Sequence, residues 1–252
     1  MHISIFGASV TQQKTGYANC YKTMNTNDDV SVYGHGGLQI HNGGLIFLEN
    51  ALKYNPDLII FDWFTPGYTD FTYDHIKLIL EELIRFCIAK KTKMLFLYLP
   101  YVEETPDTIQ KRENYYKITK NILDMYNIMW LDLSYLDNES YRYDMVHTTE
   151  EGSKKYAEAL YNKMKNLDIK LCTEDIPKNL YSNIKNFNIS KDFKSCKIES
   201  NGSILILGLH MKIGPYSKQI EYIVDNGSTQ YYNIWDKWCY YERESVHFTY
   251  TH

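Results

Sequence analysis

The sequence predicts an α/β protein with a parallel sheet covered by helices on both faces, followed by a smaller β-rich region. Short apolar runs alternate with amphipathic stretches through the first two-thirds of the chain, a rhythm typical of βαβ units. The segment 57–62 (DLIIFD) is apolar at every position between its two aspartates, as expected of a strand buried on both faces. After about residue 171 the helical spacing stops and short alternating runs begin, which indicates antiparallel structure.

Five strands are expected in the first region, each with a right-handed crossover to the next. They are predicted at 2–6, 30–33, 57–62, 93–98 and 128–133.

Four helices are predicted from apolar residues at helical spacing and from candidate caps. They span about 42–54, 70–91, 105–126 and 148–166, the last with Thr148 or Thr149 as its cap.

The β-rich region is predicted over 173–252, after an α/β domain over 1–172. Two Asn-Gly pairs, Asn201-Gly202 and Asn226-Gly227, are strong hairpin signals. The region is expected to form a small sandwich or an added sheet.

Composition and charge argue against several classes of protein. The net charge of −4 and the lack of a Lys/Arg stripe argue against nucleic-acid binding. No apolar run approaches the ~18–20 residues of a membrane span. The five cysteines are scattered and form no C-x-x-C pair, which favours reduced thiols. Since no signal peptide is apparent after Met1, a cytoplasmic protein is expected; the oligomeric state is not predicted.

Ser9 follows the first predicted strand directly, in the turn Gly7-Ala8-Ser9-Val10-Thr11. Ligands of open α/β sheets bind beyond the carboxyl ends of the strands, so a serine here is well placed for catalysis. Backbone N–H groups of a helix that starts at this point would face developing negative charge. A role as a simple helix cap is the alternative.

Asp144 and His147 lie three residues apart, just before the last predicted helix of the α/β region. This spacing lets a carboxylate hold the imidazole Nδ1–H, so that Nε2 can take a proton from a serine. The alternative is a pair of ordinary polar loop residues.

Together, these motifs resemble the SGNH (GDSL-type) hydrolase family over roughly residues 1–168. The family's first motif reads G-D-S-x-[ST], with Ala8 in place of the aspartate here, and its last motif reads D-x-x-H. The resemblance implies a flavodoxin-like three-layer α/β/α fold with strand order 2-1-3-4-5. It also implies Ser9 as nucleophile, His147 as base and Asp144 as the residue that orients it.

The family's middle motifs supply the oxyanion hole, and here they match less closely. Gly37 is the best match for the glycine that offers a backbone N–H, with Gly36 as the alternative. The asparagine expected after the third strand is absent from the segment 62–67 (DWFTPG). Either the hydroxyl of Thr65 or the side chain of Asn42 replaces it, or the activity is low.

Substrate contacts are expected from His35, Asn42 and Trp63. His35, Gln39 and His41 lie close together but without a carboxylate or cysteine at ligand spacing, so no metal is expected.

The sequence thus predicts a cofactor-free serine esterase that acts on a small polar or saccharide ester through an acyl-enzyme. The first alternative is a sugar O-acyltransferase that uses the same triad and an acyl-CoA donor. The second is a non-catalytic carbohydrate-binding protein, suggested by the missing asparagine and by the aromatic residues of 230–241.

Overall fold

The chain forms two compact units, Met1–Pro177 and Lys178–His252, which are described in turn. The predicted domain boundary between residues 172 and 173 remains a prediction. The computed structural model describes residues 1–38, 44–62, 73–100, 105–179, 209–215, 219–223, 228–233 and 243–247.

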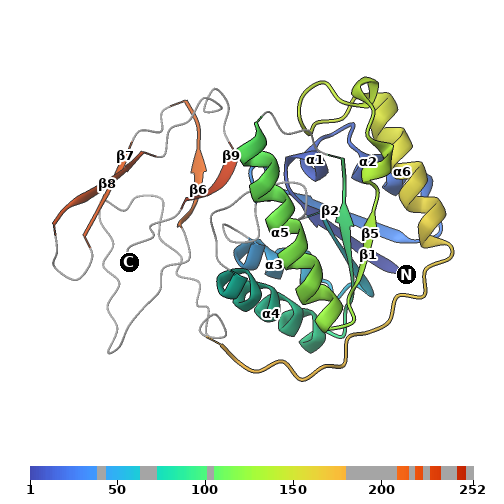
Figure 1. Cartoon of the computed structure of the whole chain (residues 1–252), viewed down its shortest axis with the longest axis horizontal. Helices are drawn as coiled ribbons and strands as arrows, with labels where there is room; N and C mark the ends of the chain where they lie inside the picture. The colour runs from blue at the N-terminus through green and yellow to red at the C-terminus, as the bar shows by residue number, and fades with distance from the viewer. Residues whose placement is uncertain are drawn as a thin grey trace. The chain divides into compact units, whose positions relative to one another are not determined.

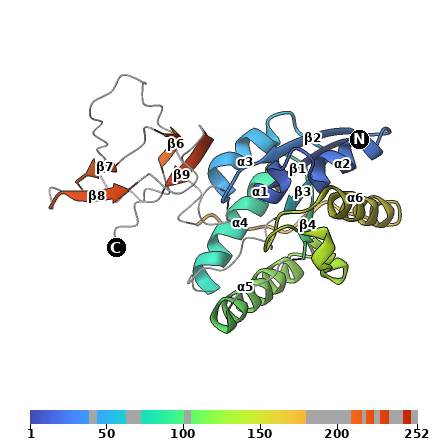
Figure 2. The same cartoon turned by 90° about the horizontal axis from the view of Figure 1, so that it is seen from above.

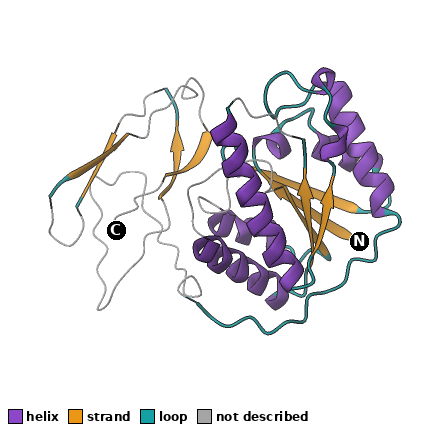
Figure 3. Ribbon diagram, in the orientation of Figure 1, coloured by secondary structure: helices purple, strands orange, loops and turns teal. Residues whose placement is uncertain are grey.

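The first unit contains a five-stranded parallel sheet in the order β2-β1-β3-β4-β5 (Figures 1 and 3), which confirms the predicted fold class and strand order. Each strand begins and ends within one residue of its predicted limits. The strands are β1 (His2–Gly7), β2 (Asp29–Gly34), β3 (Leu58–Asp62), β4 (Lys93–Tyr98) and β5 (Met129–Asp132).

Helices cover both faces of this sheet (Figure 2). On one face, α2 (Tyr17–Met24) packs against α6 (Glu150–Met164). On the other face lie α3 (Leu45–Leu52), α4 (Tyr73–Ala89) and α5 (Pro106–Met125). Among the described helices, none has both the length and the apolar character needed to cross a membrane.

Helix α2 was not among the predicted helices. It is only eight residues long, and its buried side chains are Tyr17, Ala18 and Tyr21. Two tyrosines and an alanine form a weak apolar pattern, so tertiary packing rather than local periodicity determines this helix.

The core has one layer on each side of the sheet. On the α2–α6 side, Ile3 and Ile5 of β1 pack with buried aromatic residues that include Tyr17 and Tyr156. On the opposite side the rings of Phe6, Phe61 and Phe96 form a row, with centroids 6.1 and 4.6 Å apart. This alternation along β1 holds the strand, and the turn that follows it, firmly between the two layers.

The second unit contains two antiparallel pairs among its described residues, which agrees with the predicted β-rich region. β6 (Leu209–Ile213) pairs with β9 (Arg243–His247), and β7 (Gln219–Tyr222) pairs with β8 (Gln230–Asn233). Both predicted Asn-Gly turns lie outside the described residues.

Candidate active site

Ser9 lies just beyond the carboxyl end of the inner strand β1. The strand ends at Gly7, and Ser9 is the first residue of the short helix α1 (Ser9–Gln12). A Cβ on Gly7 would lie 2.4 Å from Thr11 Oγ1 and 2.7 Å from the Cβ of Asp62, so only glycine fits there. The close approach packs the turn onto β3 and leaves Ser9 half-buried at the edge of the sheet.

Asp144 and His147 form a direct pair. The Nδ1 atom of His147 lies 2.7 Å from Oδ2 of Asp144. The other carboxylate oxygen, Oδ1, accepts hydrogen bonds from the backbone N–H groups of Val146 at 2.9 Å and His147 at 2.7 Å. One carboxylate therefore holds both the loop and the ring, and Nδ1 carries the proton when the imidazole is neutral.

The surroundings of Asp144 favour its ionised form. Partial burial alone would raise the pKa of this carboxyl group, but the two backbone hydrogen bonds and the His147 ring outweigh it. The pKa of Asp144 is therefore lowered, and the carboxylate stays ionised while it orients the ring.

The loop that carries His147 is fixed to the residues before it. Tyr143 N–H donates to the His147 carbonyl at 3.1 Å, and Arg142 and Thr148 form an antiparallel bridge. The Tyr143 ring stacks on the imidazole, with centroids 5.8 Å apart and planes 11° apart. The His147 side chain remains 29% exposed, so a substrate can reach it.

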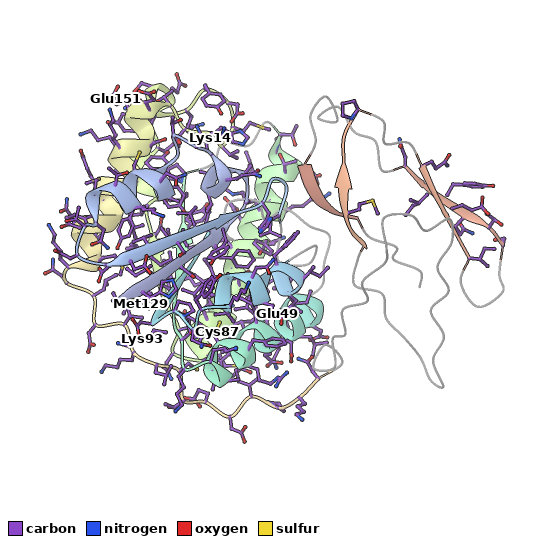
Figure 4. All side chains as sticks on the ribbon, turned by 180° about the vertical axis from the view of Figure 1, so that it is seen from behind. Lys14, Glu49, Cys87, Lys93, Met129 and Glu151 are labelled. Carbon is purple, nitrogen blue, oxygen red and sulfur yellow. The ribbon has the colours of Figure 1, made fainter. Side chains whose placement is uncertain are left out.

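Gln13 connects the two segments that hold Ser9 and His147. Its side-chain amide hydrogen bonds to the backbone of Thr148, the residue after His147, and the two positions are 135 residues apart in sequence. In Figure 4, Lys14 and Glu151 lie toward one end of the first unit, whereas Lys93 and Met129, which begin β4 and β5, lie toward the opposite end. The structure thus brings the first and last predicted motifs to the same end of the sheet.

A surface cavity of about 410 Å³ adjoins Asp144. Its lining offers carboxylates, an amide, a guanidinium group and an exposed tyrosine ring. The lining residues are Asp137, Asn138, Glu139, Arg142, Tyr143 and Asp144.

Solved structures of ester-cleaving enzymes share this architecture. The acetyl xylan esterase AlAXEase aligns with a TM-score of 0.55 at 17% identity, over 65% of this chain and 99% of its own. Est24, a carbohydrate acetylesterase from Sinorhizobium meliloti, aligns with a TM-score of 0.55 at 14% identity, over 66% and 98%. A GDSL-like lipase from Bacteroides thetaiotaomicron VPI-5482 gives 0.52 at 16% identity, over 66% and 89%.

The chain has the SGNH-hydrolase fold. No protein-family model matches its sequence, and a comparison with curated proteins finds no match.

The glycine cluster predicted as the second motif follows β2, and Gly34 at the end of that strand lies against α1. A Cβ on Gly34 would lie 2.2 Å from the backbone N of Gln12, so glycine allows the two segments to touch. Gly37 has a φ of +73°, a left-handed conformation that favours glycine. The His35 ring stacks on Phe47 with centroids 3.8 Å apart, which gives the ring a packing role in addition to any substrate contact.

Three predicted residues of the SGNH site lie outside the described residues: Asn42, Trp63 and Thr65. Their expected roles, in the oxyanion hole and in substrate contact, remain predictions. Among the described residues, no cluster of His, Cys, Asp and Glu has the arrangement of a metal site.

Two features near Ser9 were missed in the sequence. One is the Gln13 contact, and the other is a buried chain of hydrogen bonds beneath α1. Thr11 Oγ1 donates to Asp62 Oδ2 at 2.9 Å and lies 3.0 Å from the Tyr17 hydroxyl. Burial, together with the charge of Asp62, raises the pKa of Tyr17 well above its usual value. A charged residue that ends an apolar run, as in DLIIFD, was the available signal for Asp62.

Proposed function

We propose that this protein is a serine-dependent ester hydrolase that works through an acyl-enzyme. The observation that carries the proposal is the Asp144–His147 pair, on a loop hydrogen-bonded to the residue that follows the Ser9 helix. The fold supports it, because several proteins of this fold are named as esterases. Because similar folds host many reactions, the fold alone does not determine the reaction, and the residues of the site carry the proposal.

In the proposed mechanism, Ser9 Oγ attacks the ester carbonyl carbon while His147 Nε2 takes the hydroxyl proton. Asp144 accepts the hydrogen bond from Nδ1 and stabilises the imidazolium that forms. The imidazolium then protonates the leaving alkoxide, which departs as an alcohol. Water, deprotonated by His147, attacks the acyl-enzyme carbonyl carbon. The bond to Ser9 Oγ then breaks, Ser9 takes the proton back from His147, and the acid is released.

The tetrahedral intermediates carry a negative oxygen that requires hydrogen-bond donors. We assign this role to the backbone N–H groups of Ser9 and Gly37, with the hydroxyl of Thr65 as a third donor. Each donor of this kind contributes about 100- to 1,000-fold to the rate in a comparable hydrolase.

We infer that the substrate is an acetylated carbohydrate or another small polar ester. The cavity next to Asp144 has a polar, partly aromatic lining, which suits hydroxyl groups and sugar rings better than long acyl chains. Two proteins of the same fold are named as acetyl xylan esterase and carbohydrate acetylesterase. We further assign substrate contacts to His35, Asn42 and Trp63.

The first experiment compares p-nitrophenyl acetate turnover and fluorophosphonate labelling in the wild type and in Ser9→Ala. We expect labelling to vanish and kcat to fall by about 10,000-fold or more. Ser134→Ala is the matched control, because Ser134 follows β5 at the same end of the sheet and should change neither readout. Wild-type activity that survives Ser9→Ala would refute the proposal. Consumption of acetyl-CoA only when a sugar is present would instead identify an acyltransferase.

A further inference from the structure

The side chain of Gln13 pairs with the main chain of Thr148 as both donor and acceptor. Its Nε2 donates to the Thr148 carbonyl at 2.6 Å. Its Oε1 accepts from the Thr148 backbone N–H and from the Thr148 hydroxyl, both at 3.3 Å. A primary amide offers a donor and an acceptor side by side, so it can pair with the N–H and C=O of one residue much as a neighbouring antiparallel strand does.

Gln13 is also tied to Ser9 through its own backbone. It caps the carboxyl end of α1, and its N–H donates to the Ser9 carbonyl at 3.0 Å. One residue therefore joins the turn that holds Ser9 to the residue that follows His147.

Among the described residues, the other hydrogen bonds found for the His147 loop run to nearby residues of the same segment. Thr149 N–H donates to the Tyr141 carbonyl at 2.9 Å, and the Thr148 and Ser153 hydroxyls lie 2.6 Å apart. These bonds fix the shape of the loop and its junction with α6. The bonds from Gln13 instead fix the loop relative to α1.

We propose that Gln13 is a positioning residue that sets the place of His147 relative to Ser9. This inference rests on the proposed function. Proton transfer requires a heavy-atom separation of about 2.6–3.2 Å, and a displacement of about 1 Å can cost roughly 100-fold in rate. Thr148 is only 1% exposed, so water cannot easily replace the lost bonds.

The chemistry of the contact distinguishes glutamine from similar side chains. A methionine side chain has a similar length, but it cannot donate a hydrogen bond to the Thr148 carbonyl and is only a weak acceptor for the Thr148 N–H. Glutamate can accept from the N–H, but its second oxygen would face the Thr148 carbonyl and repel it. Asparagine is one methylene too short to reach from the same backbone position. We therefore expect activity to fall in all three variants, with Gln13→Met keeping the side-chain volume.

A double-mutant cycle with His147 separates positioning from general stability. Esterase rates are measured at high enzyme concentration for the wild type, Gln13→Met, His147→Ala and the double variant. We expect Gln13→Met to lower kcat by about 100-fold with little change in KM. In the His147→Ala background the same substitution should have less than about a twofold effect, because no base remains to be positioned.

Gln12→Met is the matched control, since Gln12 is an exposed residue of the same helix. It should leave kcat and the thermal midpoint unchanged. A loss of the same size in both His147 backgrounds, or a loss below about threefold in the wild type, would overturn the assignment of Gln13.

The two proposals fail in different ways. If Ser9→Ala keeps full activity, the proposed function itself is wrong. If Ser9→Ala and His147→Ala are both inactive while Gln13→Met is fully active, only the role of Gln13 is wrong.

Discussion

At the scale of single residues, the Asp144 side chain combines contacts that fix its loop with the role proposed for it in catalysis. One oxygen accepts two backbone N–H groups, and the other holds the imidazole of His147. Removing its charge should therefore affect both the rate and the loop.

We predict that Asp144→Asn lowers kcat by roughly 10,000-fold while the protein stays folded, because the ring loses its orienting acceptor. The measurement is steady-state hydrolysis of p-nitrophenyl acetate, with circular dichroism to confirm folding. Activity within about tenfold of the wild type would contradict the role given to Asp144.

The same variant should alter the acid side of the stability profile. The pKa of Asp144 is lowered from an ordinary value of 3.8, so its ionised form stabilises the fold above that value. This contribution is lost as the pH falls through the depressed folded-state pKa. Thermal midpoints measured from about pH 7 to about pH 2 should show a gap between wild type and Asp144→Asn that closes in acid. Parallel curves would show that the carboxylate is not stabilised in the folded state.

At the scale of elements, the site depends on how closely β2 approaches α1. A Cβ on Gly34 would lie 2.2 Å from the backbone N and 2.3 Å from the Cα of Gln12, and backbone atoms cannot move aside cheaply. A Cβ on Gly36 would meet only the end of the Gln12 side chain, at 3.0 Å.

These two glycines provide a matched pair of variants. We predict that Gly34→Ala costs about 1–3 kcal/mol in the free energy of unfolding and reduces activity, because it pushes α1 away from β2. Gly36→Ala should change the free energy of unfolding by less than about 0.5 kcal/mol. Urea denaturation of both variants is the measurement. Equal losses would show that α1 does not rely on this close approach.

The strands and the long helices could be predicted from sequence because their apolar patterns are local. Helix α6 even begins at a predicted cap, Thr149, whose hydroxyl accepts from the Gly152 N–H at 3.2 Å. Helix α2 could not, since two tyrosines and an alanine give too little periodicity.

The residues of the candidate site also differ in whether a local sequence pattern could predict them. Ser9, Asp144 and His147 stand in short motifs, so the sequence alone pointed to them. Gln13 could not be found in this way, because its partner is main chain, which is the same for every residue type. A hydrogen bond to main-chain atoms 135 residues away cannot be recognised from the sequence.

At the scale of the whole molecule, the core of the first unit extends to the end of that unit. Ile169, Cys172 and Ile176 are 6%, 7% and 6% exposed, although they lie beyond the last helix. Ile169 belongs to the same cluster as Ile3 and Tyr156.

We predict that residues 1–177 fold cooperatively without the second unit, whereas residues 1–168 lose at least about 3 kcal/mol in the free energy of unfolding. The loss reflects the three buried side chains that the shorter chain lacks. Urea unfolding of both fragments, followed by tryptophan fluorescence, is the measurement. Equal midpoints would show that the extended segment contributes little.

The strand order also has a consequence for biosynthesis. After β1, β2 and β3 have met, β4 and β5 join the same edge one after the other, in the order in which the ribosome releases them. The hydrogen bonds between Gln13 and Thr148 can form only later, because they connect the start of the unit to a loop that the ribosome releases after all five strands. A nascent chain can therefore build its sheet progressively, but the residues of the proposed triad come together only at the end, so the proposed esterase activity would report finished folding and not early collapse.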